Sequence, residues 1–158
     1  MSFLEADERA LLEGMVDRQR AEIAALLDDL EPDEAARRLV PSLTTPLGLV
    51  KHCTFVEKVW FHSRVAGVPR SDLGIPDEVD PSFVLQPTDT IESIRTDFLA
   101  ACQRSREIAA SHGLEEIFAW RDGRSVSLRY IHTHLIAEYA RHAGHGDILV
   151  EQIKAARG

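Results

Sequence analysis

Residues 127–157 constrain the fold and the chemistry of this chain more than any other stretch, because they hold four of its seven histidines. Side chains three, four and seven positions apart share one face of a helix. That spacing gives one stripe here: Ile131, His134, Leu135, Glu138, His142, His145 and Leu149. A carboxylate on an apolar stripe needs a compensating charge or hydrogen bond. We therefore predict a long helix, capped by the Ser127 hydroxyl, in which Glu138 and His142 share a metal ion.

The Glu138–His142 pair alone predicts little, because such pairs one turn apart are usually hydrogen-bonded near a helix surface. A third candidate ligand on another helix makes the metal hypothesis stronger. His52 meets that condition at the margin of an apolar stripe made by Leu49, Cys53, Val56 and Trp60. A lone histidine there is more often a core residue bonded to a carbonyl. Together with Glu138 and His142, we interpret His52 as the third ligand.

Two imidazoles and one carboxylate suit zinc, and they also suit nickel, iron or manganese. Three protein ligands leave one coordination position open, which is typical of a catalytic metal site. His134 and His145 are candidates for supporting or replacement ligands, and Arg141 is a candidate contact for an anionic substrate. A solvated or carboxylate-paired role is the ordinary one for Arg141. The pattern identifies no catalytic residue beyond these candidates, and three further histidines are expected at the surface: His62, His112 and His132.

Composition narrows the classes of function. The formal net charge of -8 argues against nonspecific binding to nucleic acid or to an anionic membrane, since both need a basic face. No apolar run is long enough to span a bilayer and the N-terminus lacks a signal-peptide pattern, so we expect a cytoplasmic protein. Cys53 and Cys102 lie far apart in apolar surroundings and are expected to be reduced core residues. The length favours one domain over residues 1–158.

Helical patterns predict four helices. The first covers residues 5–30, and the second begins at Thr45 and Pro46. The third covers residues 91–111 after a capping residue within 88–90, and the fourth lies within residues 127–157. A short helical turn is expected within residues 33–39. On the second helix, Glu57 and Lys58 are expected at the surface, and Trp60 is expected in the core or in the wall of a pocket.

The connections complete the predicted architecture. Residues 67–88 contain four prolines and are too long for a tight turn, so we expect a crossover along the length of the helices. An Asp-Gly turn lies in residues 114–126, where a small hairpin and a plain loop are equally consistent with the pattern. The predicted fold is an all-α four-helix bundle with one long crossover, and such bundles build metal sites from facing helices. A homodimer is the expected assembly.

The runs Ser-Leu-Arg-Tyr-Ile-His-Thr-His at 127–134 and Glu-Tyr-Ala-Arg-His-Ala-Gly-His at 138–145 resemble the last helix of the DinB-like superfamily. Residues 52–61 resemble the second helix of an actinobacterial branch related to the mycothiol-dependent maleylpyruvate isomerases. The resemblance spans nearly the whole chain and implies a four-helix bundle with a divalent metal. The family ligands fall on His52, Glu138 and His142. Many members have histidine at the first of the two last-helix positions, and the mycothiol-dependent enzymes have glutamate there.

The resemblance also implies an activity. Characterised members transfer low-molecular-weight thiols or use them as cofactors in isomerisation, with the metal holding the thiol as a thiolate. The maleylpyruvate isomerases carry an additional C-terminal domain, whereas this chain stops at Gly158. We therefore expect a metal-dependent thiol transferase that acts on a small electrophile. The alternatives are a non-catalytic metal-dependent protein that binds or senses a small ligand, and a structural dimerisation module.

Overall fold

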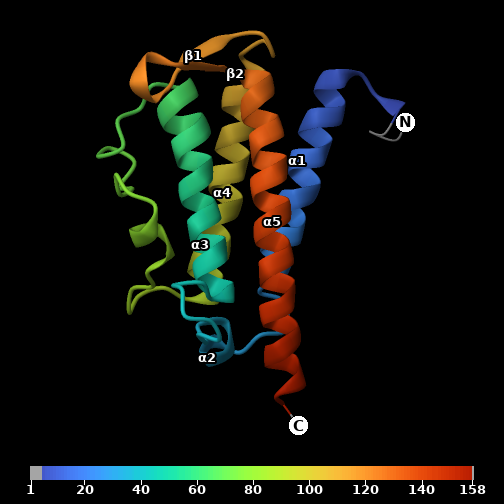
Figure 1. Ribbon diagram of the computed structural model, residues 1–158, viewed down its shortest axis with the longest axis vertical. Coiled ribbons are helices and arrows are strands. Elements are labelled where there is room, and N and C mark those ends of the chain that lie inside the picture. The colour runs from blue at the N-terminus through green and yellow to red at the C-terminus, as the bar shows by residue number, and fades with distance from the viewer. Residues whose placement is uncertain (1–4, 158) are drawn as a thin grey trace.

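The computed structural model describes residues 5–157, and these residues are mostly helical, as the sequence predicts. Four long helices lie side by side along the long axis (Figure 1): α1 (Glu8–Ala25), α3 (Pro46–Glu57), α4 (Ile91–Ala110) and α5 (Leu128–Ala155). The shorter elements are α2 (Pro32–Ala35), the π-helix η2 (Lys58–Val65), the 3-10 helices η3 (Asp80–Phe83) and η4 (Arg121–Gly123), and the strands β1 (Ile117–Ala119) and β2 (Ser125–Ser127). Among the described residues, no helix is long and apolar enough to cross a lipid bilayer.

The starts of the long helices are fixed by capping side chains. Asp7, Thr45, Thr90 and Ser127 each accept a hydrogen bond from the backbone N–H three residues ahead. Such a bond satisfies one of the donors that the first turn leaves unpaired. Pro46 follows Thr45 at a position where the missing N–H costs nothing. The helix starts predicted at Thr45 and Ser127 are therefore confirmed, and the cap predicted within residues 88–90 is Thr90.

Helix α1 is shorter than the helix predicted over residues 5–30. Leu26 caps its C-terminal end, and Asp29 has a φ of 58°, a left-handed conformation that ends the helical path. Leu26, Leu27 and Leu30 are nevertheless buried. The apolar pattern that suggested a longer helix comes from a turn that still packs on the core.

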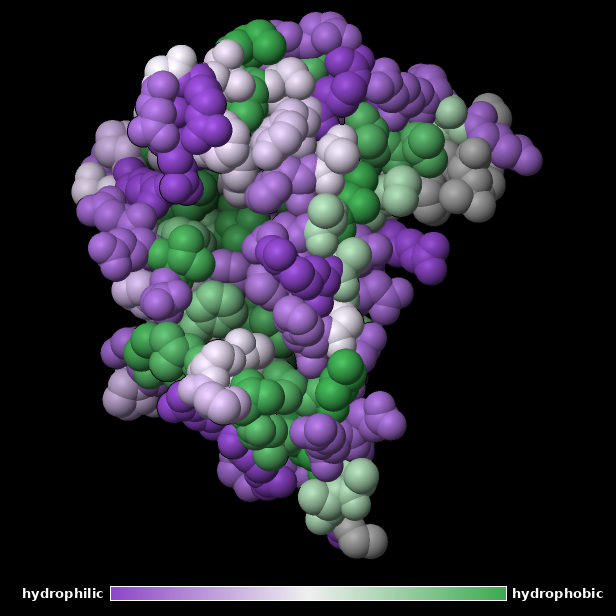
Figure 2. All heavy atoms as spheres, in the orientation of Figure 1, coloured by the Kyte–Doolittle hydropathy of each residue, from purple (hydrophilic) through white to green (hydrophobic). Residues whose placement is uncertain are grey.

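The two connections near the ends of the helices also take defined forms. Residues 66–90 run back alongside α3 to reach the start of α4 (Figure 1), and η3 within them contacts α3. Strands β1 and β2 pair antiparallel, with Ile117 opposite Ser127, so the hairpin is the alternative that occurs. Figure 2 shows a largely hydrophilic face with a hollow lined by hydrophobic side chains between the crossover segment and α5.

The core lies between the four long helices and continues into η2. Its fully buried side chains include Ile23 of α1, Leu49 of α3, Phe98 of α4 and Leu135 of α5. Cys53 and Cys102 are buried and free, as predicted.

The surface position expected for Glu57 is wrong, because this side chain is fully buried. Its carboxylate accepts two hydrogen bonds from the Arg20 guanidinium of α1, both at 2.8 Å, and one from the Tyr139 hydroxyl of α5, also at 2.8 Å. The Cys102 thiol of α4 lies 3.8 Å from the same carboxylate. One anion on α3 thus contacts all three other long helices. Its main partner lies 37 residues away in the chain, beyond the reach of a local pattern.

His62 and His132 are also buried, contrary to the surface position predicted for them. A ring nitrogen of each contacts a backbone carbonyl oxygen, at 3.2 Å from Ala101 and at 3.0 Å from Leu128 respectively. Both are therefore satisfied core histidines. Lys58 is half-buried, and its ammonium group donates to a carbonyl of the crossover segment.

Gly146 allows a close approach between α5 and the turn after α1. A Cβ at this position would lie 2.4 Å from Cδ1 of the buried Leu26, whereas a Cβ at Gly144 would meet nothing within 4 Å. A side chain is therefore excluded at Gly146 and can be accommodated at Gly144.

We expect Gly146→Ala to lower the free energy of unfolding by about 1–3 kcal/mol, because the core must shift to admit the methyl group. Gly144→Ala is the matched control and is expected to raise the free energy of unfolding by up to about 1 kcal/mol, because alanine favours the helix. Equilibrium urea unfolding followed by circular dichroism measures both. Equal effects of the two substitutions would contradict the close approach.

Glu57→Gln is expected to lower the free energy of unfolding by about 3–5 kcal/mol, because it removes the fully buried counter-ion of Arg20 and leaves only the partly exposed Asp17 to pair with that charge. Tyr139→Phe removes one hydrogen bond and is expected to cost about 1 kcal/mol. Urea unfolding at neutral pH measures both changes.

The loss of unfolding free energy caused by Glu57→Gln should depend on pH. Burial opposes ionisation of Glu57, but the Arg20 guanidinium outweighs burial and lowers the pKa of this carboxyl below its ordinary value of 4.5. A group whose pKa is lower in the folded state stabilises the fold above its unfolded-state pKa and loses that contribution as the pH falls through the folded-state value. The stability difference between wild type and Glu57→Gln should therefore hold at neutral pH and shrink below pH 4.5. A difference that grows on acidification would contradict the ion pair.

Candidate metal centre

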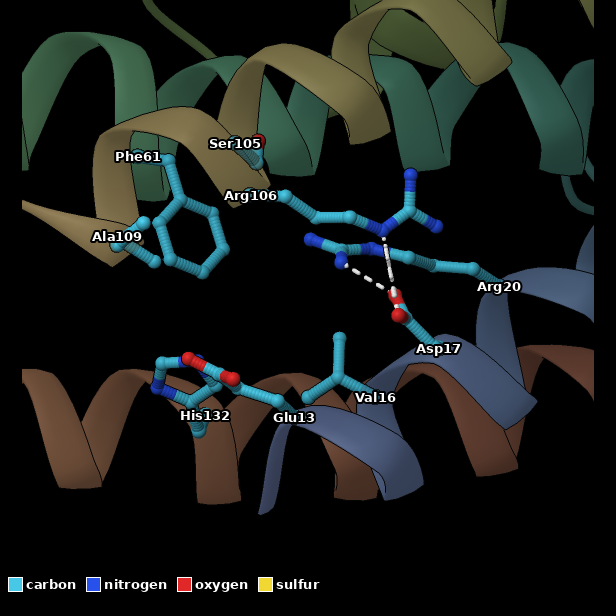
Figure 3. Close-up of a pocket in the computed structure, with 10 residues that line it drawn as sticks. Glu13, Val16, Asp17, Arg20, Phe61, Ser105, Arg106, Ala109 and His132 are labelled. Atoms are coloured by element: carbon cyan, nitrogen blue, oxygen red, sulfur yellow. Dashed lines mark hydrogen bonds and ion pairs between the residues drawn. The ribbon is translucent and has the colours of Figure 1, made fainter. Parts of the chain in front are cut away.

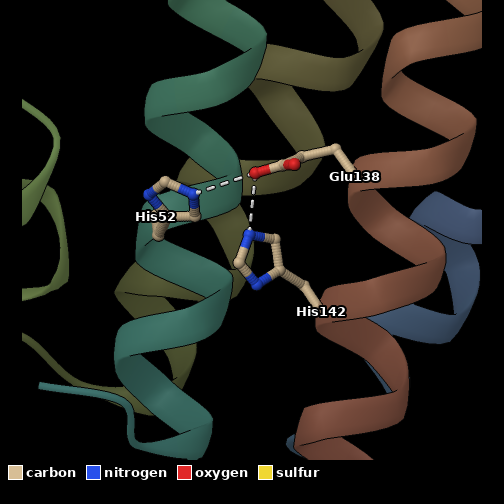
Figure 4. A group of neighbouring side chains, drawn as sticks. All are labelled: His52, Glu138 and His142. Carbon is tan, nitrogen blue, oxygen red and sulfur yellow. Dashed lines mark hydrogen bonds and ion pairs between the residues drawn. The ribbon is translucent and has the colours of Figure 1, made fainter. Parts of the chain in front are cut away.

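Three side chains that the sequence analysis selected as metal ligands converge between α3 and α5 (Figure 4). His52 comes from α3, and Glu138 and His142 come from consecutive turns of one face of α5. One candidate ligand atom from each residue lies within 4.8 Å of the other two. The Glu138 Oε1 atom is 3.0 Å from His142 Nε2 and 3.9 Å from His52 Nε2. Both histidines are buried and Glu138 is partly buried.

The crossover segment fixes the orientation of His52. Its Nδ1 atom lies 2.8 Å from the Ser82 hydroxyl oxygen, and the Ser82 hydroxyl donates its own hydrogen to the Val79 carbonyl at 2.5 Å. The Ser82 oxygen therefore accepts from a protonated Nδ1, which leaves the lone pair on His52 Nε2 directed at the cluster. Phe83 stacks on the imidazole with ring centroids 4.0 Å apart. Ser82 and Phe83 were not predicted from the sequence, because their only local signal is their place in a long loop.

The electrostatics of the His52, Glu138 and His142 cluster favour binding of a cation. Hydrogen bonding from His142, with the His52 ring and Arg141 nearby, holds the pKa of Glu138 far below its usual range, so this carboxylate is ionised. At 3.9 Å, the His52 Nε2 and Glu138 Oε1 atoms are too far apart for a hydrogen bond. A lone pair that faces an anion at this distance is unfavourable unless a positive charge lies between them. His142 presents Nε2 to the cluster, while its Nδ1 atom, on the side of the ring away from Glu138, is buried without a hydrogen-bond partner (Figure 4). These donors fit a divalent metal such as zinc.

A cavity of about 230 Å³ opens over His52 and Glu138. Its walls include Trp60 from η2 and Trp120 from the hairpin, with ring centroids 5.9 Å apart. His134 lies in the same wall, 4.5 Å from the Trp60 ring. The predicted wall position of Trp60 is therefore confirmed. The π-helical turn places Trp60 there, and such irregular turns are frequent at functional sites.

The remaining candidates lie around the cluster. Burial lowers the pKa of His134 in the cavity wall, so its ring is neutral at pH 7. His145 is exposed, with its ring centroid 6.3 Å from that of His142. Arg141 is exposed and forms an ion pair with Glu138, which is the carboxylate-paired role.

The two cysteines of the chain are poor nucleophiles. Burial raises the pKa of Cys53 and of Cys102 above the ordinary thiol value, so both stay protonated at neutral pH. Any thiolate chemistry at this site therefore needs a thiol from outside the chain.

A second cavity, of about 240 Å³, lies between α1, α4 and α5 and shares no residue with the first (Figure 3). Asp17 at its rim accepts hydrogen bonds from Arg20 and Arg106, and Arg20 also binds Glu57. Its lining side chains have no buried polar atom without a partner. We interpret this cavity as part of the ion network that joins the helices.

Comparison with known proteins gives one family. A family model described as mycothiol-S-transferase matches residues 11–155, a span that includes all three converging side chains. No curated protein matches the chain. The family match confirms the resemblance to the DinB-like superfamily.

The Ser82 contact leads to a prediction about the protonation of His52. In metal-free wild type, the neutral His52 ring should carry its proton on Nδ1, whereas Ser82→Ala removes the acceptor and should shift the proton towards Nε2. Long-range ¹H–¹⁵N correlation spectra of histidine-labelled protein distinguish the two tautomers. His112, whose Nδ1 atom contacts Glu116 instead, serves as the internal control and should not change. An Nε2–H tautomer in wild type would contradict the assignment.

Proposed function

The chain belongs to the mycothiol-S-transferase family, and from this premise we propose that it transfers mycothiol or a similar low-molecular-weight thiol to a small electrophile. We further propose that the reaction depends on a divalent metal, preferably zinc, held by His52, Glu138 and His142. The observation that carries the proposal is the convergence of two imidazoles and a carboxylate beneath a cavity of about 230 Å³.

The proposed site supplies three functions. A divalent metal bound by the three side chains would lower the pKa of a thiol and hold its sulfur as a nucleophilic thiolate. The neutral His134 ring, in the wall of the same cavity, is available to accept the proton that the thiol loses. Trp60 and Trp120 offer apolar surface that holds the electrophile and excludes water. In the transfer, the sulfur forms a bond to an electrophilic carbon, and the leaving group departs with the electron pair of the bond that breaks.

Neighbouring side chains hold the three proposed metal ligands in position. Ser82 and Phe83 hold the His52 ring with its Nε2 lone pair towards the cluster. Partners of this kind orient metal ligands, and their loss commonly costs about 10–100-fold in metal affinity. Hydrogen bonding from His142 is the main cause of the low pKa of Glu138, and the charge of Arg141, which forms an ion pair with Glu138, adds to it.

We also propose that α1, α3, α4 and α5 form a DinB-like four-helix bundle, with residues 66–90 as its long crossover. The contacts that α1 and α3 each make with all the other long helices, and the family match, support this assignment. A cytoplasmic location is consistent with the two free, buried cysteines.

The first experiment measures the metal content of the purified protein by elemental analysis. We expect about one divalent ion per chain in wild type, because three protein ligands form a catalytic-type site. The His52→Ala variant and the Glu138→Ala/His142→Ala double variant should lose it. His145→Ala is the matched control, because it removes an exposed histidine from the same helix, and it should retain the metal. No metal in wild type after reconstitution would refute the proposed site.

The second experiment measures turnover of the neutral electrophile monobromobimane with mycothiol by fluorescence. Wild type and His145→Ala should accelerate the reaction above the uncatalysed rate, and the double variant should not. A metal-loaded wild type that gives no acceleration would contradict the transferase function and favour a binding or sensing role.

A further inference from the structure

The cavity above the candidate metal centre continues into a wider vestibule of about 580 Å³. The two hollows share six lining residues: Val59, Trp120, Asp77 and three arginines. Arg64 comes from η2, Arg70 from the crossover segment and Arg121 from the hairpin. Three segments far apart in the sequence therefore bring positive charge to one opening, in a chain whose formal net charge is -8.

These positive charges have little compensation within the described residues. No carboxylate in residues 5–157 lies within ion-pair distance of Arg64, Arg70 or Arg121. Arg70 donates to the backbone carbonyls of Pro76 and Asp77. The Asp77 side chain also lines the opening and is exposed. Three guanidinium groups outnumber the single Asp77 carboxylate at this opening, so they attract an anion into the vestibule.

Arg64 is the innermost of the three. Its guanidinium carbon lies 4.0 Å from the centroid of the Trp60 ring and 6.0 Å from that of the Trp120 ring. Its Nη1 atom is buried and has no hydrogen-bond partner, and neither has Trp120 Nε1. Burial and the neighbouring charges of Arg70 and Arg121 lower the pKa of Arg64, although the group stays charged at neutral pH. A buried cationic donor without an acceptor is costly, and a bound acceptor would remove that cost.

We propose that Arg64, Arg70 and Arg121 form an oxyanion subsite, and that the electrophile accepted by this protein carries a carboxylate or a similar oxyanion. The inference rests on the proposed function, because it assigns the substrate of the same cavity. Guanidinium groups suit carboxylates, since their planar donors match the two oxygens. With the oxyanion held at the vestibule end, the reactive carbon of a small substrate lies towards His52 and Glu138.

Binding can be measured without turnover or metal, because both tryptophans of the chain, Trp60 and Trp120, line this cavity. The probes are 3,5-dinitrobenzoate and the neutral 3,5-dinitrobenzamide, two nitroaromatic compounds that quench tryptophan fluorescence and cannot react with thiols by substitution. We expect wild type to bind the benzoate at least about tenfold more tightly than the amide, a preference that corresponds to about 1.4 kcal/mol.

Variants identify the source of that preference. Arg64→Gln should weaken benzoate binding far more than amide binding and so abolish most of the preference, and Arg64→Lys should restore part of it. Arg104→Gln is the matched control, because Arg104 is an exposed arginine of α4 that lines neither hollow, and it should leave the preference intact. Equal binding of the two probes by wild type, or an unchanged preference in Arg64→Gln, would overturn the proposal.

The corresponding reactive pair is 4-chloro-3,5-dinitrobenzoate and its amide, assayed with mycothiol. In both, the thiolate sulfur forms a bond to the ring carbon, the carbon–chlorine bond breaks with release of chloride, and the thiol proton passes to a base or to solvent. Wild type should show a higher kcat/KM for the carboxylate, chiefly through a lower KM, and Arg64→Gln should remove that advantage. An equal or higher kcat/KM for the amide would count against the subsite.

The two assays separate the two proposals. Selective benzoate binding without thiol-dependent turnover of any electrophile would refute the transferase function and retain the oxyanion subsite. Turnover of monobromobimane without selective benzoate binding would retain the transferase function and overturn the oxyanion subsite.

Discussion

The structure depends on one buried carboxylate. Glu57 accepts hydrogen bonds from Arg20 and Tyr139 and lies near the Cys102 thiol, so α3 contacts α1, α5 and α4 through a single anion. A buried charge is tolerated only where charge and hydrogen bonds compensate it. Arg20 supplies the charge and is itself almost fully buried. Any sliding of one helix along another would break this arrangement, and the ion pair therefore fixes the relative positions of the helices.

The position of the candidate metal centre follows from the same contact. Tyr139 is adjacent to Glu138 on α5, and its hydroxyl also lies 3.2 Å from the carbonyl oxygen of Cys53, the residue after His52. Tyr139 points into the core towards Glu57, whereas Glu138 points towards the cavity. The hydrogen bond from Tyr139 to Glu57 thus holds α5 at the height where Glu138 and His142 face His52. Precise placement of this kind is required of metal ligands, whose donor atoms must meet at one point.

Much of this arrangement could be predicted from local patterns. The stripe along residues 131–149 and the apolar stripe beside His52 on the second helix are short-range features, and together they are sufficient to predict His52, Glu138 and His142 as a group. The burial of Glu57 was not predictable, because its partner Arg20 lies on another helix and the carboxylate alone suggests a solvated position. Ser82 and Phe83 lie in an irregular segment whose path depends on tertiary packing. The π-helical turn of η2 also changes which side chains share a face after residue 57, so a regular helical pattern could not relate Arg64 to the cavity.

Most of the buried polar side-chain atoms without a hydrogen-bond partner lie near the candidate site and not in the Glu57 network. Among the described residues, four buried side-chain polar atoms lack a hydrogen-bond partner, and three of them belong to Arg64, Trp120 and His142. Every buried polar side-chain atom of the Glu57 network has a partner on the helices. In contrast, Arg64 and Trp120 in the cavity wall, and His142 in the neighbouring cluster, each have one buried polar atom without a partner. Folding alone would favour satisfied or apolar side chains at these positions. The protein instead retains a carboxylate and two imidazoles that could hold a cation, and beside them guanidinium and indole donors without an acceptor. A bound oxyanion would supply that acceptor, and binding of either ligand would stabilise the folded state by an amount that rises with the logarithm of the ratio of ligand concentration to dissociation constant.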